Sequence, residues 1–305
     1  MTTTANTTPS VTSQLVNGLL AIKPLANLAK HQARSMMIKR AEKIGVPWRQ
    51  RVQELQNRDW DVELAQVKDA QLSYPEYYVR SFHAYEQGNL SWEAALEVEV
   101  AAYAVHAGIW KEAGKQGDAR LRQSYHNIVK EINTEPKDIL DLGCSVGMST
   151  FALQEIYPDA NLTGVDLSPY FLAVAQYNSQ ERNIKINWKN AAAEATNLPD
   201  ASFDLVSACL LFHELPQTAS KQILSEARRL LRPGGYLTIM DMNPKSEIYA
   251  KMPPYILTLL KSTEPYLDDY FALDIEQVIV DAGFETPTIT ANTLRHRTIV
   301  AQAKV

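Results

Sequence analysis

Residues 139–150 have the sequence Ile-Leu-Asp-Leu-Gly-Cys-Ser-Val-Gly-Met-Ser-Thr, and this stretch decides the fold. The apolar run that ends at Leu142 predicts a buried strand, and the glycines after it predict a tight turn before a helix that begins near Met148. The first turn of such a helix offers free backbone N–H groups, and glycines let a ligand approach the backbone closely. The stretch therefore predicts a ligand-binding turn at the carboxyl end of a strand.

The chain on either side of this turn alternates between strand-length and helix-length patterns. Apolar runs of strand length lie at 138–142, 161–166, 184–188, 203–209 and 235–240. Helical windows separate them at 148–157, 169–182 and 217–231. This alternation predicts a parallel sheet with right-handed crossovers. Two last strands, near 284–290 and 295–303, are joined by a short loop, which predicts an antiparallel hairpin at the end of the sheet.

Composition narrows the class of protein. A chain of 305 residues has room for one large domain or two modest ones. Its two cysteines exclude a disulfide framework and a four-thiolate metal site, so we expect a reducing compartment, the cytoplasm. No run approaches 18 apolar residues, so we expect no membrane-spanning helix. The net charge of −5 argues against a nucleic-acid partner.

The charge is unevenly distributed along the chain. Residues 1–45 carry six basic groups and one acid, a net +5, so the remaining residues carry −10. We expect residues 1–13 to be a disordered lead and residues 14–45 to form a basic amphipathic segment. That segment either packs on the body as a helix or makes a peripheral contact with a membrane surface, and a transit peptide stays open as well. Residues 46–135 are predicted to form a helical cap.

A second acidic position supports a nucleoside site. Asp166 ends the next predicted strand, where a carboxylate can accept hydrogen bonds from two ribose hydroxyls. The dinucleotide fingerprint G-x-G-x-x-G fails, because Ser145 and Met148 stand where its later glycines belong. Asp141 adds a carboxylate that would repel a pyrophosphate but suits a cationic sulfonium and an ammonium group. An NAD(P)-dependent oxidoreductase is therefore the weaker hypothesis.

Residues 136–245 resemble a class I S-adenosylmethionine-dependent methyltransferase, in the small-molecule branch similar to ubiquinone and menaquinone methyltransferases. Four motifs carry the resemblance, at 141–147 (Asp-Leu-Gly-Cys-Ser-Val-Gly), 165–169, 203–208 and 231–237. It implies an α/β, Rossmann-like sheet of seven strands with the last strand antiparallel, formed by residues 136–305 with an insert at 245–272. The N-terminal helices would be a cover. The implied cofactor is S-adenosyl-L-methionine, with S-adenosyl-L-homocysteine as product.

The resemblance also implies which residues bind the cofactor. These are Asp141, Gly143, Cys144, Ser145, Gly147, Asp166, Leu167, Ala192, Ala193, Glu194 and Cys209. The sequence departs from the family at Ala192, where an Asp or Asn usually bonds the adenine amino group. The backbone N–H of Ala193 or the side chain of Glu194 is expected to serve there instead.

Catalytic and acceptor-binding residues are expected around the cofactor. His213 and Glu214 follow the strand at 203–209, at a position that faces the methyl group in the resembling family; the alternative is that they only shape the pocket. Histidine is the likeliest base at neutral pH. We expect the substrate to meet Tyr78, His83, Tyr85 and Tyr103 in the aromatic segment before the sheet. No metal is expected, since Asp241 and Asn243 supply only two oxygens.

These features predict methyl transfer from S-adenosylmethionine to an oxygen or carbon of a small, moderately hydrophobic metabolite. Two alternatives remain open: a nucleic-acid methyltransferase that uses the basic N-terminal segment, and a non-catalytic partner protein that binds the cofactor. Met252-Pro-Pro-Tyr255 shares three residues with the signature of amino-group methyltransferases but lies after the wrong strand, so we take it as a chance match in a lid.

Overall fold

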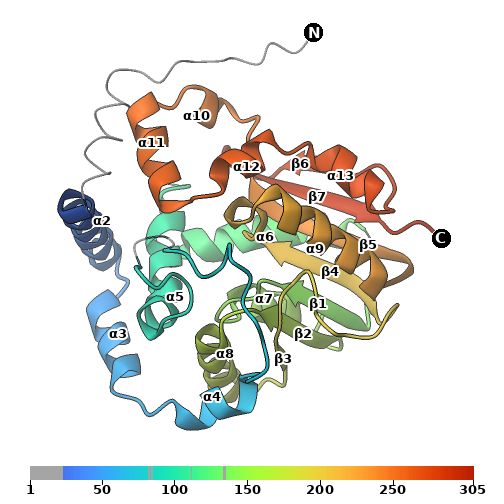
Figure 1. The fold of residues 1–305 in the computed structure, drawn as a ribbon, viewed down its shortest axis with the longest axis horizontal. Coiled ribbons are helices and arrows are strands. Elements are labelled where there is room, and N and C mark those ends of the chain that lie inside the picture. The colour runs from blue at the N-terminus through green and yellow to red at the C-terminus, as the bar shows by residue number, and fades with distance from the viewer. Residues whose placement is uncertain (1–22, 82, 84, 111, 133–134) are drawn as a thin grey trace.

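A seven-stranded sheet with the strand order β3-β2-β1-β4-β5-β7-β6 forms the centre of the protein (Figure 1). The structure is a computed structural model and describes residues 23–305 apart from 82, 84, 111 and 133–134. The strands are β1 (Asp138–Leu142), β2 (Asn161–Asp166), β3 (Asn187–Asn190), β4 (Phe203–Cys209), β5 (Leu231–Met242), β6 (Thr288–Ala291) and β7 (His296–Gln302). β7 lies antiparallel between β5 and β6, so the predicted sheet and its final hairpin are confirmed.

Three strands differ from the sequence-based boundaries. β6 begins at Thr288 and not near residue 284. β3 begins at Asn187 and not at residue 184, so residues 184–186 belong to the loop before the strand. β5 begins at Leu231, four residues before the predicted start, because the register with β4 shifts between its first and second pairs. Such a bulge absorbs the Pro233-Gly-Gly turn within the strand. The five parallel strands still end along one edge, which is where their loops build the site.

Helices cover both faces of the sheet. They are α6 (Gly117–Lys130), α7 (Met148–Ile156), α8 (Pro169–Arg182), α9 (Gln217–Leu230) and α13 (Ile275–Asp281). Leu121, Tyr125 and Val129 of α6 pack with Phe151 of α7 in one buried cluster. A second cluster joins α9 and α13 to the other face of β1, β4 and β5. The apolar runs of the strands are therefore buried from both sides, as expected for a parallel sheet.

The N-terminal half forms a cover of helices beside the carboxyl ends of the strands. It contains α2 (Lys23–Lys43), α3 (Trp48–Gln56), α4 (Asp61–Val67), α5 (Trp92–His106) and the short η1 (Gly114–Gln116). Ile38 and Ala41 of α2 are buried against Val100 and Ala104 of α5. The described part of the basic segment thus packs on the body, whereas the predictions for residues 1–13 and 14–22 lie outside the described residues. Within residues 23–305 and their gaps, no helix is long and apolar enough to cross a membrane.

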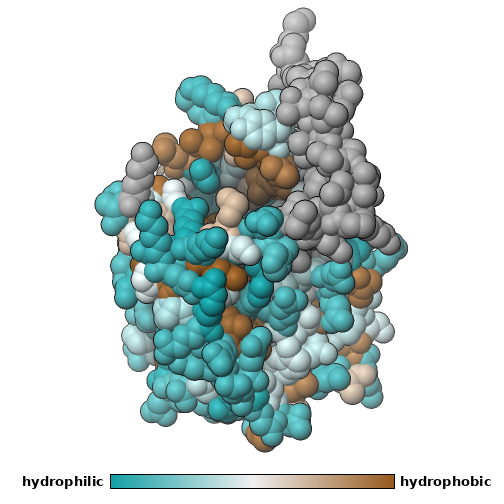
Figure 2. Space-filling view, turned by 90° about the vertical axis from the view of Figure 1, so that its left-hand side faces the viewer, coloured by the Kyte–Doolittle hydropathy of each residue, from teal (hydrophilic) through white to brown (hydrophobic). Residues whose placement is uncertain are grey.

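The insert after β5 forms three helices near the cover. These are α10 (Glu247–Ala250), α11 (Pro254–Thr263) and α12 (Leu267–Ala272), and Pro254 occupies the first turn of α11. Proline is favoured at that position, which gives the Pro-Pro pair a local structural reason. Tyr255, Ile256 and Leu259 on α11 are exposed. Figure 2 shows apolar side chains gathered near the upper end of the face that carries α2 and α11, above a mostly hydrophilic surface.

Candidate active site

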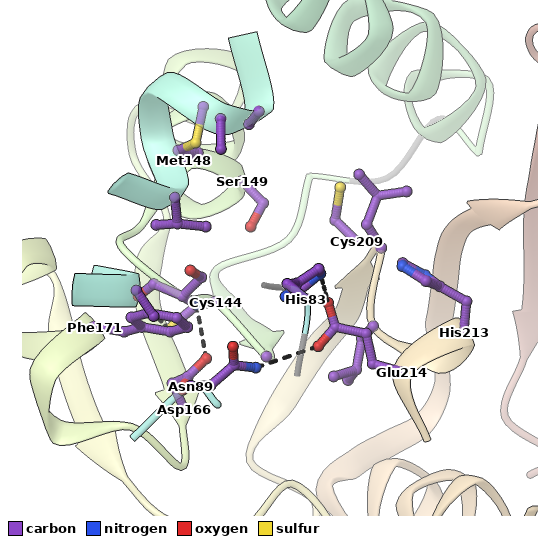
Figure 3. Close-up of a pocket in the computed structure, with 18 of the residues that line it drawn as sticks. His83, Asn89, Cys144, Met148, Ser149, Asp166, Phe171, Cys209, His213 and Glu214 are labelled. Carbon is purple, nitrogen blue, oxygen red and sulfur yellow. Dashed lines mark hydrogen bonds and ion pairs between the residues drawn. The ribbon is translucent and has the colours of Figure 1, made fainter. Parts of the chain in front are cut away.

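A cavity of about 540 Å³ lies between the carboxyl ends of the strands and the helical cover. Its floor comes from the loops after β1, β2, β3 and β4. Its roof comes from α2, the segment 77–89, α5 and the end of α11. Figure 3 shows the polar side chains that converge on it from both sides. The cavity therefore has two parts. One is a site at the carboxyl ends of the strands, as expected of a parallel sheet, and the other is a wall that the cover builds.

The glycine turn after β1 forms one end of the floor. The backbone N–H groups of Gly143 and Cys144 both donate to the carbonyl of Val165, which fixes the turn to β2. Gly143 adopts a φ of 68°, a left-handed conformation that favours glycine, and a Cβ there would also lie 2.7 Å from the Leu211 side chain. Ser145 adopts a φ of 51°, a left-handed conformation that glycine adopts with less strain. The turn thus keeps the shape of the family motif although serine replaces its middle glycine.

Asp166 connects this turn to the next one. Its carboxylate accepts hydrogen bonds from the backbone N–H of Ser145 and of Ser168, each at 2.8 Å. The Tyr78 hydroxyl approaches the same carboxylate at 3.5 Å. Burial raises the pKa of Asp166 to about 6, against the lowering effect of these hydrogen bonds. Tyr78, predicted to contact the substrate, therefore lies beside the predicted ribose carboxylate.

Four of the predicted cofactor residues lie outside the cavity lining: Asp141, Gly147, Ala192 and Glu194. Asp141 is buried beneath the turn and accepts hydrogen bonds from the hydroxyls of Ser149 and Thr150. Burial raises its pKa to about 6. Glu194 accepts a hydrogen bond from the Tyr77 hydroxyl at 2.6 Å.

The other predicted cofactor residues do line the cavity. They are Gly143, Cys144, Ser145, Asp166, Leu167, Ala193 and Cys209, and Ala191 joins them. Leu167, Ala191 and Ala193 provide an apolar surface next to Asp166, suited to a flat base. The buried hydroxyl oxygen of Ser145 has no hydrogen-bond partner among the described residues, and neither has one oxygen of Asp141. Unsatisfied buried groups at this turn fit a polar ligand that would satisfy them.

Sequence reasoning missed a buried cation in the wall. Arg122 on α6 lines the cavity; its side chain is only 12% exposed, and it pairs with Asp118 at 2.9 Å. It also approaches the sulfur of Cys209, at the end of β4, at 3.5 Å. Asp118 is shared with His106, at 2.7 Å; burial raises the pKa of Asp118, but the charge of Arg122 and then the hydrogen bond with His106 lower it below its ordinary value. An arginine four residues after an aspartate in an amphipathic helix was the available signal. Its guanidinium suits a carboxylate ligand.

A histidine–aspartate pair stands at the other side of the floor. His213 lies in η2 (Phe212–Glu214), and its Nδ1 is 2.7 Å from the Oδ1 of Asp241, which ends β5 and is fully buried. The other oxygen of Asp241 accepts from the backbone N–H of Phe212 at 2.8 Å. Burial lowers the pKa of His213, but the charge and hydrogen bond of Asp241 raise it to about 10. Because Nδ1 is held, Nε2 is the nitrogen left for the cavity.

Asp241 therefore lies at the site as the partner of His213, which was not predicted from the sequence. From the sequence, Asp241 and Asn243 are only two oxygen-bearing residues, too few for a metal site. Asn243 instead stabilises the turn that follows, by accepting from the backbone N–H of Lys245.

The roof contributes three of the four predicted substrate residues: Tyr78, His83 and Tyr85. The Tyr85 hydroxyl donates to Glu97, whose side chain is buried and also paired with Arg34 of α2. Tyr103 does not line the cavity; its hydroxyl donates to Glu99, and its ring packs between α2 and α5. His83 Nε2 faces two carboxylates, Glu264 at 3.3 Å and Glu214 at 3.6 Å.

Comparisons with known proteins agree with this geometry. Residues 139–235 match a family model described as "Methyltransferase domain". A demethylmenaquinone methyltransferase of Thermus thermophilus is 31% identical over 126 residues, which is 41% of this chain and 56% of that protein. A ubiquinone biosynthesis O-methyltransferase of Pseudomonas paraeruginosa is 30% identical over 159 residues, covering 50% of this chain and 66% of its own length. The chain thus spans between about half and two thirds of the length of these curated relatives.

Solved structures share the fold at lower identity. A phosphoethanolamine N-methyltransferase of Haemonchus contortus, in complex with phosphomonomethylethanolamine and S-adenosylhomocysteine, superposes with a TM-score of 0.54 at 14% identity. The match covers 72% of this chain and 60% of that one. A Nostoc punctiforme protein provisionally assigned as an O-methyltransferase also gives 0.54, at 20% identity, covering 80% of this chain and 67% of that one. Both likenesses concern the fold.

Proposed function

We propose that this chain, whose residues 139–235 match a methyltransferase domain, uses S-adenosylmethionine to methylate a hydroxyl group of a small, moderately hydrophobic acceptor. Bound S-adenosylmethionine supplies an electrophilic methyl group, and the protein supplies alignment, exclusion of water and removal of a proton. The observation that carries the choice of a hydroxyl is the pairing of His213 with Asp241 beside the cavity. A base is needed when the nucleophile holds a proton of high pKa.

The floor suits each part of the cofactor. Asp166 would accept the ribose hydroxyls, and Leu167, Ala191 and Ala193 would pack against the adenine. Arg122 would pair with the methionine carboxylate, because it is the buried cation beside the end of β4. Asp141, one layer deeper with an unpartnered oxygen, would balance the positive charge of the cofactor.

His213 would remove the acceptor's proton. With Nδ1 donating to Asp241, Nε2 can take the hydroxyl proton as the oxygen attacks the methyl carbon and the carbon–sulfur bond breaks. A cationic sulfonium bound in the cavity would lower the pKa of the His213 imidazolium and so would favour the neutral base. Asp241 then stabilises the imidazolium that forms. The similarity to ubiquinone biosynthesis O-methyltransferases supports oxygen over carbon as the acceptor atom.

The roof suggests the kind of acceptor. Ala94, Val98 and Ala101 of α5 line the cavity together with Met37 of α2. The polar residues on the roof are mainly acids and tyrosines. Such a wall suits an apolar or aromatic body with a few hydroxyl groups. It disfavours a polynucleotide, because Glu97, Glu214 and Glu264 would face its phosphates.

Labelled cofactor tests the proposal directly. The full-length protein is incubated with S-adenosylmethionine carrying a labelled methyl group and with an extract of the source organism. Products are then identified by mass spectrometry. We expect label in an O-methyl ether that is absent when His213→Ala replaces the wild type. Label on nitrogen or in RNA would contradict the proposal, and cofactor binding without any labelled product would favour the non-catalytic alternative.

A further inference from the structure

Three side chains meet at the roof of the cavity, outside the machinery that the proposed function uses. They are His83, Glu214 and Glu264, and one potential ligand atom from each lies within 4.8 Å of the others. They come from three distant parts of the chain: the segment before α5, the loop after β4 and the end of α11. Figure 3 shows His83 and Glu214 turned toward each other across the cavity.

The spacing of these atoms differs from that of the other histidine–carboxylate contacts. Nδ1 of His213 and of His106 each lie 2.7 Å from an aspartate oxygen, which is a direct hydrogen bond. Nε2 of His83 lies 3.3 Å from Glu264 and 3.6 Å from Glu214. Metal–ligand bonds of about 2.0–2.1 Å at tetrahedral angles place neighbouring ligand atoms about 3.3–3.5 Å apart. The cluster therefore has the spacing of ligands around a small cation.

A second observation concerns Glu264. Its side chain is about nine-tenths buried, and its Oε2 has no hydrogen-bond partner among the described residues. Within that part of the chain, the ion pairs that Glu214 and Glu264 make are both with His83. Two carboxylates, that of Glu264 buried and that of Glu214 22% exposed, share one imidazole and leave negative charge that a divalent cation would neutralise.

The surrounding structure holds the three side chains in place. The backbone N–H of His83 donates to the carbonyl of Thr263, the residue before Glu264, at 3.0 Å. The side-chain amide of Asn89 approaches the second oxygen of Glu214 at 3.5 Å. Contacts of this kind orient metal ligands in known sites.

We propose that His83, Glu214 and Glu264 bind one divalent cation, with zinc the best match, and that its open position receives an oxygen of the acceptor. Zinc accepts both imidazole nitrogen and carboxylate oxygen, and catalytic zinc sites combine three protein ligands with one open position, whereas magnesium prefers oxygen ligands alone. The role for the acceptor rests on the proposed function, but the binding of the cation does not. A hydroxyl on the cation would be held near His213 and made more acidic.

Calorimetric titration of metal-free, full-length protein with ZnCl₂ tests the site without cofactor or acceptor. We expect one zinc per chain, and at least tenfold weaker binding in Glu264→Gln and in His83→Ala. Glu247→Gln is the matched control, since Glu247 is an exposed carboxylate on the same insert, and it should bind zinc as the wild type does. MgCl₂ should bind at least tenfold more weakly than ZnCl₂.

A second measurement covers variants that fold poorly. Zinc should raise the melting temperature of the wild type and of Glu247→Gln, but not that of Glu264→Gln, whose buried amide replaces a charge at constant shape. No stoichiometric zinc binding, or binding that Glu264→Gln leaves unchanged, would overturn the inference and identify the cluster as a histidine shared by two glutamates. Methyl transfer in protein that binds no zinc would overturn the cation site and leave the proposed function standing. Zinc binding without methyl transfer would support the cation site and overturn the proposed function.

Discussion

At the scale of single residues, the carboxylate of Asp166 both holds the local backbone and lines the cavity. It fixes the glycine turn through Ser145 and the following helix through Ser168, and it lines the cavity where a ribose would lie. Its position could be predicted from the sequence, because a strand ending in an acid is a local pattern.

We expect Asp166→Ala to weaken the binding of S-adenosylhomocysteine at least tenfold, because the two ribose hydrogen bonds are lost. Isothermal titration calorimetry measures this, with Asp159→Ala as a control at an exposed aspartate. Near-wild-type affinity in Asp166→Ala would rule out the ribose assignment.

The pairing of His213 with Asp241 has a consequence for the pH dependence of the rate. The pKa of His213 is raised to about 10, with Asp241 the main cause opposing burial, and the base is active only when neutral. The rate should therefore rise with pH. Asp241→Asn removes the negative charge, so the rising limb of kcat should move to lower pH while its maximum falls. The pH profiles of the two proteins provide the measurement, and a limb that stays in place would contradict the role of Asp241.

At the scale of elements, α6 carries a buried histidine that cannot accept a proton readily. Burial, followed by the nearby charges of Arg122 and Lys130, lowers the pKa of His126 from 6.5 to about 4. The unfolded chain takes up this proton as the pH falls below about 6.5, whereas the folded chain does so only near pH 4. The free energy of unfolding contributed by this site is therefore present above that range and is lost as the pH falls through it.

When the pH falls from 7 to 5, the free energy of unfolding should drop by about 2 kcal/mol less in His126→Phe than in the wild type. Urea denaturation at the two pH values gives the difference, and His31→Gln on the exposed surface of α2 is the control. Equal losses in wild type and His126→Phe would show that this histidine is not the acid-sensitive group.

The helix α2 is attached to α5 by a partly buried ion pair, Arg34 with Glu97. The Glu97 side chain is 2% exposed and that of Arg34 33%, so removal of the arginine leaves a carboxylate inside the protein, whereas removal of the acid leaves a cation that can reach water. We expect Arg34→Ala to cost about 2 kcal/mol of unfolding free energy and Glu97→Gln about 1 kcal/mol. Urea melts measure both, and the reverse order would contradict this account.

Helices and strands of the sheet followed from local patterns, but the contacts between elements did not. The run that ends at Leu142 is almost continuously buried, and the helix over 169–182 begins with Ser168 as its N-cap and Pro169 in its first turn. Arg122 and Asp241 come next to the cavity only through the packing of α6 and β5 in the folded protein. Their spacing along the chain does not predict that packing. The same holds for Tyr103, whose ring faces α2 and not the cavity.

At the scale of the whole molecule, the basic N-terminal segment contributes to the cavity. Removal of residues 1–45 would take away Arg34 and Met37 from the cavity and expose Val100 and Ala104 of α5. We expect the truncated protein to melt at least several degrees lower and to lose turnover. Differential scanning calorimetry and the labelled-methyl assay check this. A truncated protein with the wild-type melting temperature would show that α2 is dispensable.

A liposome flotation assay addresses the other hypothesis for the segment. If residues 14–45 contact a membrane surface, full-length protein should float with anionic vesicles and the truncated protein should not. Full-length protein that never floats would leave packing on the body as the only role of the segment.

The division of the cavity into a floor and a roof bears on how an acceptor should be sought. The floor lies in the stretch that other methyltransferases share, since the family match covers residues 139–235. The roof residues His83, Tyr85 and Glu97 precede that stretch, and Glu264 follows it. The two parts can diverge separately in evolution, because a new acceptor requires changes only above the cofactor. Genes that encode the same roof, and the metabolic neighbours of those genes, are therefore better guides to the acceptor than overall similarity to quinone methyltransferases.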